Sequence, residues 1–435
     1  MINRKILEKL DLWRKTKGRK CLILQGARQV GKTFAVRMFA ARRYEELLEI
    51  NFKETPSAKE IFSGELTVDR MIMALRFRYP EKAIDPEKTL IFLDEIQECP
   101  EAITSLKFWT QNGKYNIIAS GSLLGIDHNR ASSYPVGYVE YLKMHGLDLQ
   151  EFFAAFGIGD DLTGMLKDCL DRSEPVPPVV HSSCMEYFRL YAAIGGMPEV
   201  VQRYLDMRDF RVVDKTQREL LQGYRYDIAH YASSDEKEKA EKCFMSLARQ
   251  LLDKENHKFQ YKEVEHGGRA QKYYSSIDWL LNADIVRLCR SVTDIRYDLD
   301  DYARDDFFRA YTGDLSLLIP MKDFSLKQHI VENTLSGSTK GGLYECAVAD
   351  ILIKKDCPLY FYKNETSRRE IDFLIQKDGC IIPIEVKSSN SRATSLNSLM
   401  KNHPELPQAY KLADGNIGKG DDRITTIPLY MGMFL

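Results

Sequence analysis

Eight residues near the start of the chain have the types and the spacing of a phosphate-binding loop. They are Gly26-Ala27-Arg28-Gln29-Val30-Gly31-Lys32-Thr33, which fit the pattern G-x-x-x-x-G-K-[ST]. Between a strand and a helix, such a loop points successive backbone N–H groups at one place, where the positive end of the helix dipole also acts. We expect all eight residues to bind the phosphates of ATP. Lys32 would contact the β- and γ-phosphates, and the Thr33 hydroxyl would bind Mg²⁺.

The residues on either side of the loop predict the elements that this chemistry needs. Residues 21–25 form a short apolar run typical of a buried strand, and residues 34–40 predict a helix. The motif therefore occupies a strand-to-helix turn. A chance match in a glycine-rich loop is the weaker interpretation.

Two acidic residues end another apolar strand. Residues 89–93 read Thr-Leu-Ile-Phe-Leu and are followed by Asp94 and Glu95. Near-continuous apolar runs are typical of parallel strands that helices cover on both faces. We expect Asp94 to hold Mg²⁺ opposite Thr33, and Glu95 to orient and polarise the attacking water. An exposed acidic strand end is the alternative, and the phosphate loop in the same chain weakens it.

A fourth strand is predicted at residues 115–120. Ser120 and Ser122 follow its apolar residues, and a polar side chain there could contact the γ-phosphate or the water. Asn116 is the weaker candidate because it lies earlier in the strand. A serine that only caps a turn is an equally good interpretation.

The composition limits the class of protein. A chain of 435 residues predicts two to four domains. The formal charge of -1 gives no general support for nucleic-acid binding, although a local basic face stays open. No apolar run is long enough for a membrane span, and the charged N-terminus does not resemble a signal peptide. The nine scattered cysteines predict reduced thiols in a cytoplasmic protein.

Four segments together resemble a family. A strand between the phosphate-loop strand and the carboxylate strand is the arrangement of the AAA+ class, and the chain is similar to prokaryotic AAA-type ATPases that carry an uncharacterised C-terminal domain. The segments are G-A-R-Q-V-G-K-T, L-I-F-L-D-E-I-Q-E-C-P, I-I-A-S-G-S-L-L-G and G-G-M-P-E-V-V at residues 195–201. The resemblance implies ATP hydrolysis, a homo-oligomer as one expected assembly, and an arginine supplied by a neighbouring subunit. Arg130 and Arg28 are the candidates for that arginine, and a solvated arginine is the stronger interpretation of Arg130.

The middle of the chain predicts helices. Residues 151–235 form a helical segment, and residues 236–325 fit a winged-helix-like module of two helices followed by a strand. In such a module the segment 268–276 would begin the recognition helix, which is a weak signal for DNA. A protein-packing module is at least an equally good interpretation. The acidic stretch 298–306 would repel phosphate if it lies nearby.

A second set of charged residues lies in the last quarter of the chain. Glu345 falls in a predicted helix, Asp372 begins an apolar strand, and Glu385 and Lys387 flank Val386 on the next strand. A period of two places Glu385 and Lys387 on the same face. An Asp-Gly turn at residues 378–379 predicts a hairpin that brings Asp372 beside them.

The order of these four residues resembles the PD-(D/E)xK nuclease fold. The resemblance implies that Glu345, Asp372 and Glu385 are metal ligands and that Asp372, Glu385 and Lys387 are catalytic, with Lys387 activating water or stabilising charge on the phosphate. Glu370-Ile371-Asp372 departs from the usual Pro-Asp. Two alternatives remain: an ordinary edge strand, or a nuclease-like domain that has lost activity and only binds a partner.

The sequence therefore predicts an α/β protein of four parts. They are an AAA+ P-loop ATPase domain (1–150), a helical segment (151–235), a winged-helix-like module (236–325) and a PD-(D/E)xK nuclease-like domain (326–435). The predicted cofactors are ATP and Mg²⁺, and the predicted partners are ATP or ADP and DNA or RNA, with no membrane. The first hypothesis is a motor or switch that acts on nucleic acid and cleaves it with Mg²⁺. The alternative is a nucleotide-dependent regulator with an inactive, partner-binding C-terminal domain.

Overall fold

The computed structural model describes residues 2–121, 135–233, 235–253, 258–363, 369–389, 391–419 and 423–435. The chain forms two compact units. The N-terminal unit contains Arg4–His145 and Asn282–Asp284. The C-terminal unit contains Gly146–Leu281 and Ile285–Leu435.

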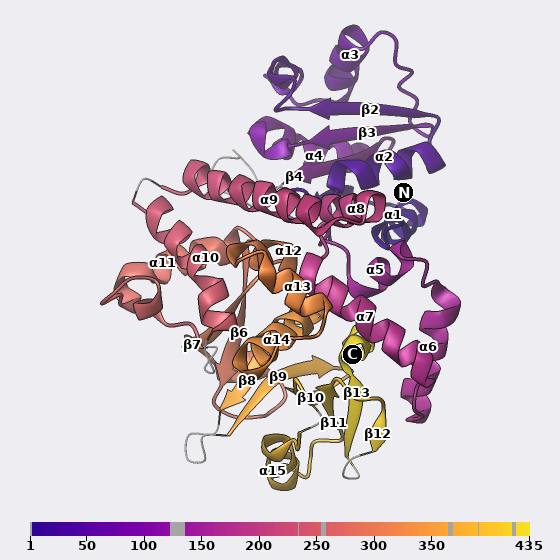
Figure 1. The fold of residues 1–435 in the computed structure, drawn as a ribbon. Coiled ribbons are helices and arrows are strands. Elements are labelled where there is room, and N and C mark those ends of the chain that lie inside the picture. Colours follow the sequence, from indigo (N-terminus) through magenta and orange to yellow (C-terminus); the bar gives the residue numbers. More distant parts are fainter. Residues whose placement is uncertain are drawn as a thin grey trace. The chain divides into compact units, whose positions relative to one another are not determined.

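The N-terminal unit is built on a parallel sheet of five strands (Figure 1). The strand order is β2-β3-β4-β1-β5, so β4 lies between the phosphate-loop strand β1 and the carboxylate strand β3, as predicted. All six residues of β3 are buried, as expected for a strand covered on both faces. The strands are β1 (Cys21–Gln25), β2 (Glu46–Asn51), β3 (Thr89–Asp94), β4 (Asn116–Gly121) and β5 (Val139–Lys143).

Helices cover both faces of this sheet. Alternate residues of the strands, such as Ile23 and Ile91, share one apolar core with Leu75 and Trp109 of two helices. The helices of this unit are α1 (Ile6–Lys15), α2 (Lys32–Arg43), α3 (Val68–Arg78) and α4 (Pro100–Asn112), with the short 3₁₀ helices η1 (Pro56–Phe62) and η2 (Ile96–Glu98). Helices α3 and α4 contribute to that core, whereas α2 packs against α1 and strands β2, β3 and β4. The α/β fold predicted for this part of the chain is confirmed.

The first part of the C-terminal unit is helical, which confirms the prediction for residues 151–235. Its helices are α5 (Leu149–Ala155), α6 (Asp160–Arg172), α7 (Pro178–Ile194), α8 (Pro198–Met207) and α9 (Phe210–Tyr231). The turn between α7 and α8 contains Gly195 and Gly196 of the G-G-M-P-E-V-V segment. Gly195 has φ +75, a value that favours glycine.

The rest of the C-terminal unit surrounds a mixed sheet of eight strands, in the order β12-β13-β11-β10-β9-β8-β6-β7. The strands are β6 (Val286–Val292), β7 (Ala303–Thr312), β8 (Leu359–Lys363), β9 (Glu370–Lys377), β10 (Cys380–Val386), β11 (Ala409–Ala413), β12 (Gly418–Lys419) and β13 (Ile424–Pro428). The predicted hairpin is present as β9 and β10. Its turn places Asp378 at φ 49 and Gly379 at φ 78, as a tight two-residue hairpin turn requires.

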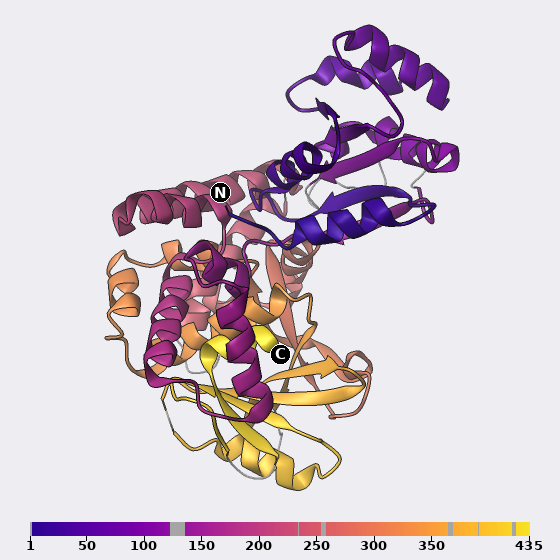
Figure 2. The same ribbon diagram turned by 90° about the vertical axis from the view of Figure 1, so that its right-hand side faces the viewer.

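Helices flank this sheet as well. They are α10 (Lys237–Leu252), α11 (Ala270–Asn282), α12 (Leu315–Leu318), α13 (Ser325–Val331), α14 (Gly337–Ile353) and α15 (Thr394–Asn402), with the 3₁₀ helices η4 (Tyr261–Glu263), η5 (Leu299–Tyr302), η6 (Ile319–Met321) and η7 (Leu429–Phe434). Helix α14 packs against β7, β8 and β10, and α15 packs against β9, β10 and β11. In Figure 1, α14 and α15 lie on opposite sides of the sheet, and Figure 2 shows α15, in yellow, beyond the strands in a view turned by 90°.

The eight-stranded sheet runs through the position where the sequence predicts a domain boundary, near residue 325. Strands β6 and β7 belong to the predicted winged-helix-like module, and the other six strands belong to the predicted nuclease-like domain. Strand β6 pairs with β8 in parallel, with Arg290 opposite Tyr360. The two predicted parts thus share one sheet, and the four-part division of the chain stays a prediction.

Within the described residues, no helix is both long enough and apolar enough to cross a membrane. The cytoplasmic location stays a prediction. All nine cysteines are free, and most of them are buried.

Candidate functional site

The phosphate loop joins β1 to α2 through two residues in the left-handed region. Gln29 has φ 62 and Gly31, which precedes α2, has φ 93. Gly26 is required for a different reason: a Cβ at this position would lie 2.2 Å from the carbonyl oxygen of Met144, just after β5. The loop therefore needs its glycines both for backbone conformation and for close packing on the chain after β5.

Lys32 lies at the centre of this loop. Its Nζ donates hydrogen bonds of 2.9 Å to the carbonyl oxygens of Gly26 and Ala27. The side chain is buried, and burial lowers the pKa of its ammonium group, whereas the charges of Glu95 and Asp94 raise it. The ammonium group is thus held in the curve of the loop, where it could bind a phosphate oxygen.

Asp94 is oriented by groups from four segments of the N-terminal unit. Its Oδ2 accepts hydrogen bonds from Thr33 Oγ1 at 2.9 Å and from Asn51 Nδ2 at 3.2 Å. Its Oδ1 accepts one from the hydroxyl of Ser120 and one from the backbone N–H of Glu95 at 3.1 Å. Because the Thr33 hydroxyl and the Asp94 carboxylate lie together, they offer the oxygen ligands that Mg²⁺ prefers. The residues present therefore fit a magnesium ion.

Glu95 occupies a constrained position after β3. Its backbone has φ 52, and its side-chain Oε2 accepts a hydrogen bond from Gln97 Nε2. The Oε1 atom of Gln97 is buried and has no hydrogen-bond partner among the described residues. It lies close to the backbone of Gly121, where an added Cβ would approach it to 2.6 Å. Glu95 is thus held beside Asp94 by a neighbouring amide.

The other polar residues predicted for this site differ in whether they lie beside Asp94. Ser120 contacts Asp94, in keeping with a role at the site. Asn116 lies at the opposite end of β4, where it accepts from Arg19 and donates to the carbonyl oxygen of Pro86 at 2.9 Å, so its role is structural. Ser122 and Arg130 lie outside the described residues.

Asn51 and Gln97 were not predicted as site residues. Asn51 ends β2, opposite Asp94 in the register of the two strands. The signal in the sequence was its position: the carboxyl ends of parallel strands meet at one edge, where ligands bind. Gln97 gave no comparable signal, because its role depends on the left-handed turn at Glu95.

In the C-terminal unit, the hairpin brings three of the four predicted residues together. Asp372 Oδ2 accepts from the backbone N–H of Val386 at 2.8 Å, which ties β9 to the end of β10. Glu385 Oε1 forms an ion pair with Lys387 Nζ at 2.7 Å, and its Oε2 accepts from the backbone N–H of Leu396 at 3.1 Å. These acidic side chains are thus engaged by groups of the protein itself.

Glu345 joins this cluster through an arginine that the sequence did not single out. Arg309 Nη1, from β7, donates to Glu345 Oε1 at 2.6 Å, and its Nη2 pairs with Glu370 and lies 3.7 Å from Asp372 Oδ1. Burial and the charge of Glu345 raise the pKa of Asp372 to about 7, although Arg309 opposes the shift. Among the described residues, no group of three or more His, Cys, Asp or Glu is arranged to hold a metal ion. We call Arg309, Glu345, Glu370, Asp372, Glu385 and Lys387 the carboxylate cluster.

A second buried charge cluster surrounds the G-G-M-P segment. Lys354 Nζ, at the end of α14, lies 2.6 Å from Asp314 Oδ2, 2.9 Å from Asp350 Oδ2 and 2.8 Å from the hydroxyl of Tyr191. Asp314 Oδ1 accepts from the backbone N–H of Gly196 at 2.9 Å. A Cβ at Gly196 would lie 2.5 Å from Lys354 Nζ. The two glycines thus have a packing role, because they let the α7–α8 turn approach buried charges.

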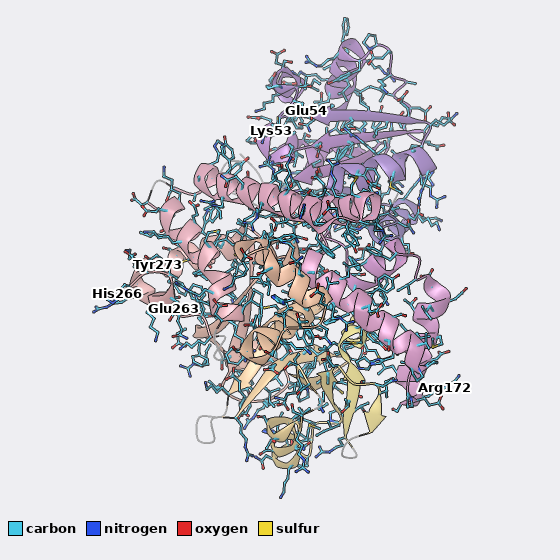
Figure 3. All side chains as sticks on the ribbon, in the orientation of Figure 1. Lys53, Glu54, Arg172, Glu263, His266 and Tyr273 are labelled. Atoms are coloured by element: carbon cyan, nitrogen blue, oxygen red, sulfur yellow. The ribbon has the colours of Figure 1, made fainter. Side chains whose placement is uncertain are left out.

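The predicted recognition helix is α11, and part of its predicted surface is buried. Tyr273 is fully buried and bonds to Glu265, which also pairs with Lys272 Nζ at 2.6 Å. Figure 3 labels Glu263, His266 and Tyr273 in this region. Arg269, Lys272 and Tyr274 are exposed, so the basic and aromatic character of the helix start is only partly available to a ligand.

Comparisons with known proteins identify similarity to described protein families in three segments of the chain. Residues 18–153 match the family described as an AAA domain. Residues 185–328 and 340–431 match two domains of unknown function, DUF8612 and DUF4143. The match supports an AAA domain at residues 18–153. This confirms the AAA+ P-loop interpretation of the N-terminal part of the chain. The nuclease-like interpretation of the C-terminal part stays a prediction. No curated protein matches the chain.

Solved structures resemble the chain only at low similarity. The ORC1 protein of Aeropyrum pernix in complex with DNA is 12% identical over 77% of this chain and 93% of that chain, with a TM-score of 0.28. The RuvB Holliday junction branch migration motor of Thermotoga maritima is 14% identical over 66% and 89%, with a TM-score of 0.29. AMPPCP-bound DnaA from Aquifex aeolicus is 12% identical over 64% and 86%, with a TM-score of 0.28.

Proposed function

We propose that the N-terminal unit binds ATP with Mg²⁺ and hydrolyses it. The observation that carries the proposal is the 2.9 Å contact between Thr33 Oγ1 and Asp94 Oδ2, beside the loop that holds Lys32. Bound Mg²⁺ neutralises charge on the phosphates and orients them. Thr33 and Asp94 would hold the ion, and Lys32 would bind the β- and γ-phosphates. Glu95 would orient and polarise the attacking water, while Ser120 and Asn51 fix the direction of the Asp94 carboxylate.

Replacing Lys32 with Ala tests the phosphate-loop assignment. We expect ATP turnover to fall about a hundredfold, because the variant lacks one preorganised charge at the transferring phosphate. Lys53→Ala is the matched control, since Lys53 is an exposed lysine of the same unit (Figure 3) and should leave turnover unchanged. Turnover that persists in Lys32→Ala would show that these residues are not the ATPase site.

For the C-terminal unit we propose a nuclease-like fold that works with nucleic acid as a binding partner. Support for the fold is the order of Glu345 on a helix, Asp372 on β9, and Glu385 and Lys387 at the end of β10. A binding role is favoured over cleavage because cations of the protein, Arg309 and Lys387, already pair with the predicted metal ligands Glu345 and Glu385. The exposed Arg269, Lys272 and Tyr274 of the α11 region are the residues that favour a nucleic-acid partner.

The rate of ATP hydrolysis with duplex DNA, single-stranded DNA or RNA tests this partner. We expect at least one of them to stimulate turnover. The double variant Arg269→Ala/Lys272→Ala should weaken its binding and lower the slope of log K against log salt by about 1–2, since each of the two basic side chains would neutralise one phosphate. The control variant Arg203→Ala/Lys215→Ala removes two exposed basic residues from helices α8 and α9. It should change neither the affinity for nucleic acid nor the salt dependence of binding. If no nucleic acid binds or stimulates turnover, the partner is of another class.

A further inference from the structure

The centre of the carboxylate cluster is a buried guanidinium group. Arg309 is only 3% exposed, and it projects from the middle of β7. Its Nη1 contacts Glu345 Oε1 at 2.6 Å and the backbone oxygen of Asp372 at 3.4 Å, and its Nη2 pairs with Glu370. The guanidinium carbon lies 4.7 Å from the centre of the Phe361 ring. One cation from the protein is thus shared among three acidic residues.

A buried guanidinium group costs several kcal/mol unless its charge is paired and its donors are used. Here the carboxylates of Glu345 and Glu370 supply that pairing, and the Tyr311 hydroxyl donates a further hydrogen bond to Glu345. Removing Arg309 would leave these carboxylates close together with no cation between them. The arginine is therefore part of what permits several acidic side chains to be buried here.

Three further oxygens of the cluster also have partners within the protein. Asp372 Oδ2 accepts from Val386, and both oxygens of Glu385 have partners, Lys387 Nζ and the backbone N–H of Leu396. A magnesium or manganese ion requires several oxygen ligands at close to 2.0–2.2 Å in octahedral geometry, with few competing donors. The residues present do not fit a divalent ion, because the guanidinium group of Arg309 already pairs with the carboxylates between which the ion would bind. Asp94 differs, because its hydrogen-bond donors are neutral groups.

We infer that the guanidinium group of Arg309 takes the place of a divalent cation among these carboxylates. The cluster is then a closed, metal-independent ion network, and the C-terminal unit does not cleave phosphodiester bonds. Arg309 also joins β7 to α14 and β9, two elements on the other side of the predicted boundary near residue 325. This inference deepens the binding role proposed for the C-terminal unit and is independent of ATP hydrolysis.

Manganese binding to the full chain tests this inference. Asp94→Asn serves as the parent, because it replaces the negatively charged carboxylate proposed to hold Mg²⁺ in the N-terminal unit with a neutral amide and so weakens that site. Mn²⁺ binding is measured by electron paramagnetic resonance titration. We expect the parent and the control Arg304→Ala to bind the same amount of Mn²⁺ with and without the additional substitution Asp372→Asn. Arg304 is a partly exposed arginine of the same strand, paired with Asp306. Adding Arg309→Ala should create one Mn²⁺ site that Glu345→Gln removes. Arg309→Ala should also lower the melting temperature of the protein by at least about 5 °C. Added Mn²⁺ should raise the melting temperature of this variant.

A cleavage assay supplies a second measurement that does not depend on the folding of Arg309→Ala. Wild-type protein is incubated with plasmid DNA, linear duplex DNA, single-stranded DNA and RNA in the presence of Mg²⁺ or Mn²⁺. We expect no cleavage above that of Asp372→Asn and Lys387→Ala. Cleavage by the wild type that both variants abolish, or a Mn²⁺ site in the parent that Asp372→Asn abolishes, would overturn the inference. ATP turnover of the same preparations is measured in parallel, so a failure of the ATPase proposal is seen separately.

Discussion

Replacing Glu95 with Gln will lower ATP turnover by about 10²- to 10⁴-fold, the range for loss of a positioned general base. The amide keeps the size of the side chain and can still accept the hydrogen bond from Gln97, but it cannot accept a proton from water. The contact between Thr33 and Asp94 does not involve this side chain. We therefore expect nucleotide affinity to stay within a few-fold of wild type, as measured by titration with a fluorescent ATP analogue.

Glu98→Gln is the matched control for this prediction. It makes the same chemical change three residues later, at the end of η2, and should leave both turnover and affinity unchanged. The backbone of Glu95 has φ 52, a conformation that glutamine and glutamate adopt at similar cost, so protein stability should not change. Wild-type turnover in Glu95→Gln would assign the water-positioning role to another group. Loss of nucleotide binding would show that Glu95 acts mainly in binding.

The nucleotide site could be predicted from sequence because its residues act close to where they stand in the chain. The loop from Gly26 to Thr33 is contiguous, and Asp94-Glu95 follows directly on an apolar strand. The position of β4 between β1 and β3 was also predicted and is confirmed. Local patterns succeed here because a parallel sheet brings the ends of its strands to one edge.

The partners that orient the site could not be predicted with the same detail. Asn51 donates to Asp94 across 43 positions of the chain, and its place at the end of a predicted strand is the one signal in the sequence, which does not identify Asp94 as its partner. Gln97 acts on Glu95 only because the backbone turns sharply between them. Such contacts depend on tertiary geometry, which a motif does not encode.

Arg309 shows the same limit more clearly. It lies 36 positions before Glu345 in a strand that contains several charged and aromatic residues, where an arginine is usually exposed. The pairing of β6 with β8 makes β7 an outer strand of the sheet that also carries Asp372. The sequence placed these strands in different domains, so it could not place the arginine among the carboxylates. The structure brings the four predicted residues into one cluster, and their roles stay a prediction; the sequence did not identify the cation between them.

The G-G-M-P segment was useful for the family resemblance but gave no indication of a role. In the structure it adjoins the second buried charge cluster, where Lys354 is completely buried between Asp314 and Asp350. Burial raises the pKa of Asp350 to about 6, although the charge of Lys354 opposes the shift. A single ammonium group thus pairs with both buried carboxylates, and the stability of the folded C-terminal unit should depend on it.

Replacing Lys354 with Met should destabilise the C-terminal unit by about 3–5 kcal/mol, the cost of removing one partner from a buried ion pair. Methionine has a similar length and is apolar, so the destabilisation comes from the carboxylates of Asp314 and Asp350 left without their cation. Lys167→Met is the matched control. Lys167 and Asp171 are four positions apart, as are Lys354 and Asp350, but their ion pair is exposed and not buried. The control should cost no more than about 0.5 kcal/mol in urea unfolding.

The pH dependence of this destabilisation identifies its cause. Without Lys354, the folded-state pKa of Asp314, which the lysine helps to hold low, should rise above its unfolded value, and the already raised pKa of Asp350 should rise further. A carboxyl group with a raised folded pKa contributes its full stability below the unfolded pKa and loses it as pH rises through the folded pKa. The deficit of Lys354→Met should therefore be larger at neutral pH than at mildly acidic pH, as measured by urea unfolding against wild type. A deficit that does not change with pH would show that poorer packing around the lysine stem, rather than unpaired charge, destabilises the variant.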